Sequence, residues 1–141
     1  MDERPRGTRH RRPRLTRSAD FDRVYRRGRS AATRSFVLYA FPSAERGGEE
    51  RDESSEVRDE VRLGVSVGRR VGGAVDRNRV KRMLREAFWA LDEELPEGHD
   101  FVIVARAGAA ETAEEAGLEG VRNELSELLA RLATQPAGRG A

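Results

Sequence analysis

Residues 76–85 of the chain read DRNRVKRMLR, and this stretch is the strongest single indication of the fold. Apolar residues recur here and beyond at every third or fourth position, which is typical of a helix that packs one side against a core. These residues are Val80, Leu84, Phe88, Leu91 and Leu95. Proline at position 96 and glycine at position 98 end the pattern. The spacing predicts a helix from about residue 75 to residue 95.

A second face of this helix is basic. At 100° per residue, Arg77, Lys81 and Arg85 share one side, and Asn78 and Arg82 flank it. Positive charges placed so closely repel one another, so the pattern favours an anionic partner such as a phosphate backbone. A solvated charged face is the alternative, but such faces usually mix both signs, and this one carries no acidic residue from position 77 to position 85.

Working outward, alternation and composition predict three strands and two further helices. The strands are residues 35–41 (SFVLYAF), 62–67 (RLGVSV) and 100–105 (DFVIVA), the last of which is apolar enough to be fully buried. Helical spacing recurs at about residues 15–27 and 112–132. The order is αββαβα without an internal repeat, which predicts an α+β fold, a small α-β sandwich.

Charge and hydropathy divide the 141 residues into one domain and three polar segments. Residues 1–14 are almost free of apolar side chains and are predicted to form a disordered basic arm. Residues 43–60 are predicted to form an acidic, solvated loop, and residues 133–141 a disordered tail. Residues 15–132 are left as a single folded domain.

The composition excludes several classes of protein. The net charge of +2 conceals two basic blocks, since residues 1–44 carry 12 Arg against 4 acidic residues and residues 61–89 carry 8 basic against 2. Such blocks favour a polyanionic partner. The absence of cysteine excludes disulfide scaffolds, thiol catalysis and cysteine-ligated metals, and it suggests a cytoplasmic setting. No apolar run approaches the ~20 residues of a membrane span, so we expect no membrane partner.

Aromatic residues interleave with arginines in the first block. Phe21 and Tyr25 lie four residues apart on the first predicted helix, and Phe36 and Tyr39 lie on the first predicted strand. Rings beside guanidinium groups can stack with unpaired bases. A core position is an equally good interpretation for Phe21 and Phe36, whereas the tyrosine hydroxyls favour an edge.

We find no residue set with the spacing of a catalytic or metal site. Residues 64–68 (GVSVG) match a nucleophile elbow, but Ser66 falls inside a strand pattern and the chain is too short for that hydrolase fold. His10 and His99 lie far apart and lack metal-ligand spacing. We therefore expect no catalytic residue, no metal ligand and no protein-bound cofactor.

Several segments together resemble the protein component of bacterial ribonuclease P. They are residues 14–30 (RLTRSADFDRVYRRGRS), 62–67, 72–75 (GGAV), 77–82 (RNRVKR, similar to its Arg-Asn-Arg motif) and 100–106 (DFVIVAR). The likeness covers about residues 14–132 in the expected order, whereas an isolated Arg-Asn-Arg would not be specific. The sequence departs from the family pattern in its long acidic loop and at Tyr25, a position that is often phenylalanine in the family.

The resemblance implies an α-β sandwich with a left-handed crossover, the ribosomal protein S5 domain 2-like fold, acting as a single RNA-binding domain. It implies the small subunit of an endoribonuclease that removes the 5′ leader of precursor tRNA. The catalytic centre and its Mg²⁺ would belong to the RNA subunit, and the partners would be that RNA and precursor tRNA. The alternatives are another structured-RNA-binding protein, ribosomal or an assembly factor, and a DNA-binding regulator, which the lack of a helix-turn-helix pair disfavours.

The resemblance also implies two sets of binding residues. The leader would lie in a cleft between the first helix and the sheet, lined by Phe21, Tyr25, Ser30 and Tyr39. The catalytic RNA would contact Arg77, Asn78, Arg79, Lys81, Arg82 and Arg85.

Overall fold

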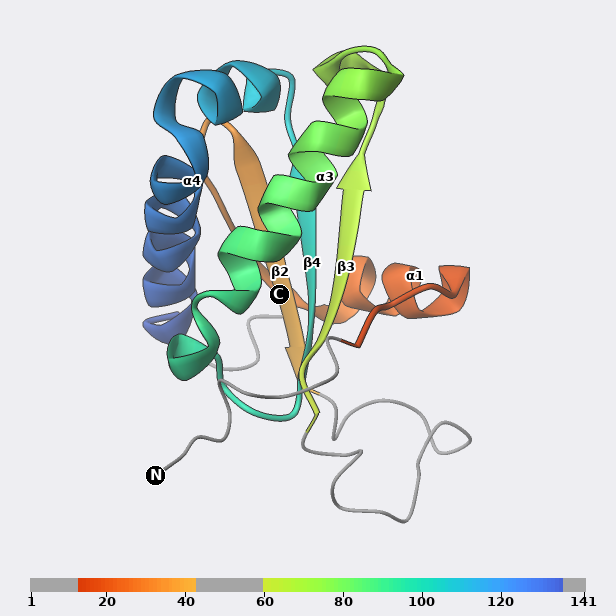
Figure 1. Ribbon diagram of the computed structural model, residues 1–141. Coiled ribbons are helices and arrows are strands. Elements are labelled where there is room, and N and C mark those ends of the chain that lie inside the picture. Colours follow the sequence, from red (N-terminus) through yellow and green to blue (C-terminus); the bar gives the residue numbers. More distant parts are fainter. Residues whose placement is uncertain (1–12, 43–59, 136–141) are drawn as a thin grey trace.

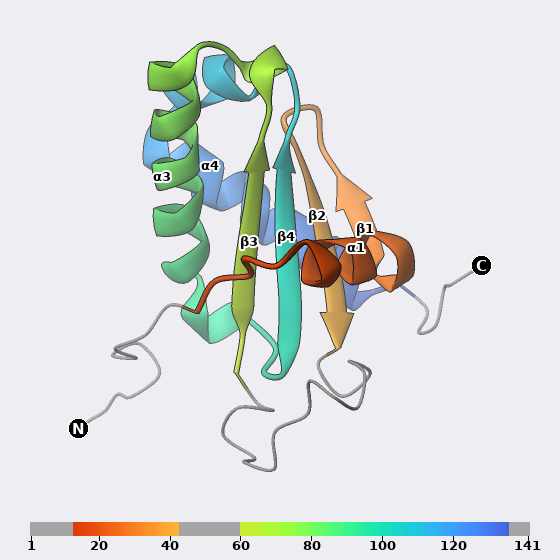
Figure 2. The ribbon, with the colours of Figure 1, turned by 90° about the vertical axis from the view of Figure 1, so that its right-hand side faces the viewer.

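The computed structural model describes residues 13–42 and 60–135 of the chain. One four-stranded sheet forms the middle layer, with two long helices on one face and a short helix across the other (Figures 1 and 2). The elements are α1 (Ser18–Arg27), β1 (Arg29–Ala32), β2 (Phe36–Pro42), β3 (Arg62–Val67), α3 (Ala74–Trp89), β4 (His99–Ala105) and α4 (Ala109–Ala133). Two 3₁₀ turns, η4 (Arg69–Val71) and η5 (Asp92–Glu94), flank α3.

The strand order is β1-β2-β4-β3, in which β3 and β4 are parallel and the other neighbours antiparallel. The parallel pair needs a crossover, which α3 supplies. With α3 in front of the sheet, β4 lies to the left of β3 (Figure 1), and the turned view agrees (Figure 2). The crossover is therefore left-handed, as the resemblance implied and against the usual rule.

Alternation along the strands produces two apolar clusters. The larger lies between the sheet and the pair α3 and α4, and includes Phe36, Leu84 and Leu125. The smaller lies beneath α1 and consists of Leu15, Val24, Phe41 and Val102. Because α1 is only ten residues long, it crosses its face near the middle of the strands and leaves the parts of β3 and β4 above it uncovered by any described element (Figure 2). That partly covered face is where a ligand can approach the sheet.

The main difference from the predicted order αββαβα is β1, an additional edge strand. Its four residues, RSAA, carry no run of β-branched or aromatic side chains, so no local pattern marks it. The strand is instead stabilised by its partners. It pairs with β2, and its outward carbonyls accept hydrogen bonds from α4 and the residues after it: Arg131 Nη1 donates to Ala32 O at 2.8 Å, and Gln135 Nε2 to Ser30 O at 2.8 Å.

The helix boundaries also differ from those predicted. α3 ends at Trp89, and the predicted continuation towards residue 95 is a turn that contains η5, although Leu91 and Leu95 are buried as expected. α1 begins only at Ser18, because Leu15 is held by β3 instead: its N–H donates to Leu63 O at 2.9 Å. α4 is broken at Gly117, whose φ of +69° suits glycine and few other residues.

The three polar segments predicted at residues 1–14, 43–60 and 133–141 lie largely outside the described residues. No described helix is both long enough and apolar enough to cross a membrane.

Candidate nucleic-acid interface

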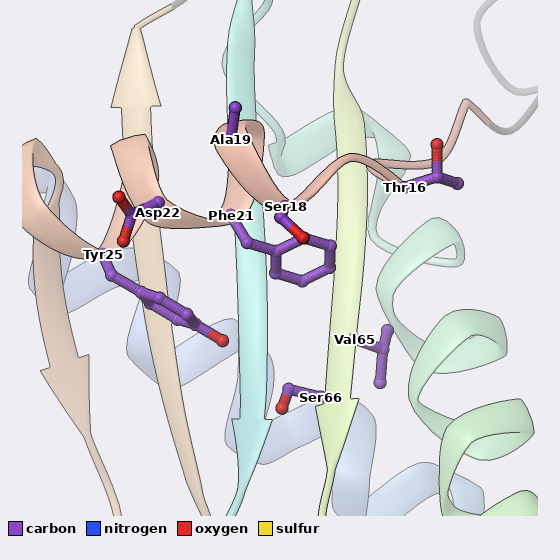
Figure 3. A pocket seen from close by; sticks show the side chains of 8 residues that line it. All are labelled: Thr16, Ser18, Ala19, Phe21, Asp22, Tyr25, Val65 and Ser66. Atoms are coloured by element: carbon purple, nitrogen blue, oxygen red, sulfur yellow. The ribbon is translucent and has the colours of Figure 1, made fainter.

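A hollow of about 560 Å³ lies between α1 and β3, and we call it the α1 cleft (Figure 3). It is lined by Thr16, Ser18, Ala19, Phe21, Asp22, Tyr25, Val65 and Ser66. The helical residues come from one side of α1 and the segment before it, while Val65 and Ser66 come from the edge strand β3. The cleft therefore has one wall of helix and a floor of sheet.

Three aromatic rings form a continuous series at this cleft. The ring centroids of Phe21 and Tyr25 lie 6.2 Å apart, and those of Tyr25 and Tyr39 lie 5.1 Å apart in an edge-to-face arrangement. Phe21 and Tyr39 are half-buried against the smaller apolar cluster, whereas Tyr25 is 38% exposed. Tyr25 is thus the ring most accessible to a stacking partner.

Glycine on β3 allows Phe21 to lie directly on the sheet. A Cβ at Gly64 would come within 2.6 Å of Cζ of Phe21, so any side chain there would displace the ring. Two residues further along the same face, the Ser66 side chain forms a hydrogen bond with Tyr25. Partial burial raises the pKa of Tyr25, with a smaller rise from Tyr39, while the hydrogen bond to Ser66 opposes it. The phenol is therefore neutral near pH 7.

The structure brings together most of the residues predicted to bind the leader. Phe21 and Tyr25 line the α1 cleft, and Tyr39 supports Tyr25 from β2. Ser30 is exposed on β1, opposite Tyr39 in the strand register, but it does not line the hollow. Phe36, for which a core role was the alternative, is fully buried on the other face of the sheet.

A buried ion network, which we call the α1 network, holds α1 against the sheet. The guanidinium of Arg62 on β3 donates two hydrogen bonds to the carboxylate of Asp100 on β4, from Nε and Nη2, each 2.9 Å long. The same Nη2 lies 3.7 Å from Oδ1 of Asp20 on α1, which also accepts from Nη1 of Arg23 at 2.9 Å. Both carboxylates are buried, with Asp20 at 2% exposure and Asp100 at 0%. These two arginines and two aspartates thus hold α1 at a fixed distance from the sheet.

The basic residues of α3 have a different environment. Arg77, Arg79, Lys81 and Arg85 are half-buried, and Asn78 and Arg82 are exposed. Among the described residues, none of these side chains forms an ion pair, and Nε of Arg79 is buried without a hydrogen-bond partner. Their positive charge is therefore not neutralised within the described part of the chain.

The α1 cleft and the basic helix are neighbours. Val65 lines the cleft and also packs on the larger cluster beneath α3, so a single strand, β3, separates the two surfaces (Figures 2 and 3). The α1 cleft contains aromatic rings and hydroxyl groups, and the adjacent face of α3 carries guanidinium groups. This combination suits a ligand with both unpaired bases and a phosphate backbone.

Six cleft residues were not predicted from the sequence, namely Thr16, Ser18, Ala19, Asp22, Val65 and Ser66. For Ser66 a signal existed, since alternation within residues 62–67 places Gly64 and Ser66 on one face as two small residues where a helix can approach. The side chain of Ser66 points towards Tyr25 and the interior of the cleft (Figure 3). In the described residues, no group of three or more His, Asp or Glu side chains could hold a metal ion.

Comparisons with known proteins agree on one family. The family model Ribonuclease P matches residues 10–133. The ribonuclease P protein component of Brevibacillus brevis is 38% identical over 122 residues, which cover 86% of this chain and 84% of the relative. That of Shouchella clausii is 41% identical over 93 residues, 66% of each chain.

Solved structures give the same result. The ribonuclease P protein of Staphylococcus aureus superposes with a TM-score of 0.66 at 31% identity, covering 88% of this chain and 97% of the other. The protein from Thermotoga maritima superposes with a TM-score of 0.68 at 31% identity, covering 85% and 97%.

Proposed function

This chain belongs to the ribonuclease P protein family, and we propose on that premise that it assists a catalytic RNA subunit in removing the 5′ leader of precursor tRNA. The observation that carries the proposal is the adjacency of the aromatic α1 cleft to the basic face of α3, whose side chains form no ion pair with any described residue. A cytoplasmic location and an association with precursor tRNA are parts of the same proposal.

The α1 cleft is the proposed site for the single-stranded leader. Stacking on an aromatic ring tolerates any base and contributes about 1–3 kcal/mol per base. Tyr25 has an exposed ring that packs edge-to-face on Tyr39, so the ring is accessible to a base and is supported from the sheet. The 5′ leader is present in precursor tRNA and is absent from the product of its removal, so this cleft would distinguish substrate from product.

The basic face of α3 is the proposed contact with the RNA subunit. Guanidinium groups form paired hydrogen bonds with phosphates, and a helix that is anchored by a buried stripe presents them rigidly. Val80 and Leu84 anchor α3 in the larger cluster, while Arg77, Lys81 and Arg85 recur every four residues along its other side. Asn78, Arg79 and Arg82 extend the same proposed surface.

We place the catalytic centre, with its Mg²⁺, in the RNA subunit. The one serine that matched a hydrolase pattern, Ser66, is hydrogen-bonded to a phenol rather than to a base that could activate it. The protein would then contribute by binding the leader and the RNA, so that the chain alone should not cleave precursor tRNA.

A Tyr25→Ala variant, assembled with the RNA subunit, tests the leader site. We expect binding of precursor tRNA to weaken about 5- to 150-fold, the equivalent of the stacking energy above, with binding of mature tRNA nearly unchanged. Tyr25 is a better choice than Tyr39, which is half-buried and contributes to the apolar cluster. The matched control is Leu118→Ala, since Leu118 is also an exposed apolar residue, at 42%, but lies on α4.

Equal losses for precursor and mature tRNA would contradict the leader site. If the wild-type protein bound the RNA subunit but did not stimulate cleavage of precursor tRNA, a structured-RNA-binding protein without a processing role would be the better description.

A further inference from the structure

A single carboxylate lies in the α1 cleft. Of the eight described residues that line the cleft, Asp22 is the only charged one, and the others are apolar, aromatic or carry a hydroxyl group. The Asp22 side chain is 60% exposed and comes from the same helix as Phe21 and Tyr25 (Figure 3). A negative charge at this place opposes the approach of phosphates, but it does not oppose neutral bases.

The carboxylate of Asp22 keeps most of its capacity to accept hydrogen bonds. Its Oδ2 lies 3.4 Å from Nε of Arg26, one turn further along α1, and this is the one ion pair that Asp22 forms with a described residue. The contact is exposed to solvent and involves only one of the two oxygens. A carboxylate accepts hydrogen bonds and donates none. Asp22 therefore presents acceptor sites to whatever enters the cleft.

Asp22 is a neighbour of the ring that is most accessible to a base. Residues three apart on a helix are adjacent on its surface, and Asp22 and Tyr25 both line the α1 cleft. The exposed ring of Tyr25 packs on Tyr39 with a centroid distance of 5.1 Å, which supports it from the sheet. For a base that stacks on Tyr25, Asp22 is therefore the one charged group in the described lining of the cleft.

We infer that Asp22 is a specificity-determining residue of the leader site, whose carboxylate accepts a hydrogen bond from the amino group of the base on Tyr25 and disfavours uracil there. The inference rests on the proposed function for the identity of the ligand. Cytosine, adenine and guanine each carry an exocyclic amino group, whereas uracil has carbonyl oxygens on both sides of its single N–H. Those oxygens face a carboxylate unfavourably. The same charge keeps the phosphates of the leader away from Asp22.

Cytosine and uracil give the sharpest test, because they have the same size and differ in the amino or carbonyl group at C4. Precursor tRNAs would carry leaders that are identical except for one nucleotide, cytosine or uracil, at each position in turn. With the wild-type protein assembled with the RNA subunit, we expect one position at which cytosine binds about 5-fold more tightly, less than a buried charged hydrogen bond gives because Asp22 is exposed. Asp22→Asn should bring this ratio to about 1, since an amide both donates and accepts and can pair with either base.

Arg26→Gln is the matched control, because it breaks the same ion pair and keeps the carboxylate. The preference for cytosine should persist in this variant. Both variants should melt at nearly the wild-type temperature, since an exposed pair contributes little to stability. If Asp22→Asn and Arg26→Gln both remove the preference, Asp22 acts only by positioning Arg26 and the inference is wrong. A preference that survives Asp22→Asn would overturn it as well.

Tyr25→Ala separates a failure of this inference from a failure of the proposed function. If Tyr25→Ala weakens binding of precursor tRNA but not of mature tRNA, while the wild-type protein shows no preference for cytosine at any position, Asp22 does not select a base and the leader site is retained. If Tyr25→Ala affects both tRNAs alike, the leader site itself fails and the role of Asp22 fails with it.

Discussion

The α1 network and the basic face of α3 use the same side chain in opposite ways. In the α1 network, Arg23 and Arg62 each lie 2.9 Å from a buried carboxylate, and the charges cancel within the protein. On α3, neither Arg77 nor Arg85 forms an ion pair with a carboxylate of any described residue. The difference shows that an arginine-rich composition does not by itself predict a nucleic-acid interface. The location of the nearest carboxylate decides whether an arginine stabilises the fold or is available to a partner.

The largest loss of unfolding free energy should come from a substitution in the α1 network. Replacing Asp100 by Ala leaves Arg62 without its two 2.9 Å hydrogen bonds, and breaking a buried pair from one side costs about 3 kcal/mol or more of unfolding free energy. Urea denaturation of the free protein would measure this loss as a lower midpoint with an unchanged slope. A loss below 1 kcal/mol would mean that the buried Arg62–Asp100 pair contributes little to the stability of the fold.

Substitutions on the basic face of α3 should have a smaller effect, and this effect should be on RNA binding rather than on stability. Arg77→Ala and Lys81→Ala should each leave the unfolding free energy within about 0.5 kcal/mol of the wild type, because no ion pair with a described residue is lost. Binding to the RNA subunit should weaken by about 1.5 kcal/mol for each variant, and the salt dependence of log K should fall by about 1. Titrations at several salt concentrations would show this, and unchanged affinity together with unchanged salt dependence would rule out α3 as the RNA contact.

The smallest effect should come from a pair that is formed but not buried. Oδ2 of Asp22 lies 3.4 Å from Nε of Arg26 on α1, and both side chains are largely exposed. Exposed pairs of this spacing contribute about 0.3–0.5 kcal/mol. Asp22→Ala should therefore change the unfolding free energy by no more than about 0.5 kcal/mol in the same urea experiment. A loss comparable to that of Asp100→Ala would show that pairing alone, without burial, separates the two regions.

Local periodicity explains which parts of the fold could be predicted. β3 was expected at residues 62–67 and is found there, and the apolar stripe from Val80 to Leu95 is buried, because alternation and helical spacing are both visible in a short window. β1 could not be found in this way, since its four residues become a strand only through β2 and the C-terminal end of α4. The extent of α3 was overestimated for a similar reason: buried leucines after Trp89 continue the spacing although the helix itself has ended.

The candidate site likewise has parts that lie within one element and parts that depend on contacts between elements. The aromatic pair on α1 and the basic row on α3 each lie within one element, so the sequence predicts them. The role of Asp20 depends on Arg62, and that of Arg62 on Asp100, across separations that no local pattern encodes.

The hydrogen bonds that cover β1 have a consequence for the protein before it meets any RNA. An open strand edge can recruit the same strand of another molecule and start aggregation. In this fold the carbonyls of Ser30 and Ala32 are already occupied by Gln135 and Arg131, so an incoming chain would have to displace both side chains before it could add to the sheet. A newly synthesised copy is thereby protected at this edge against self-association.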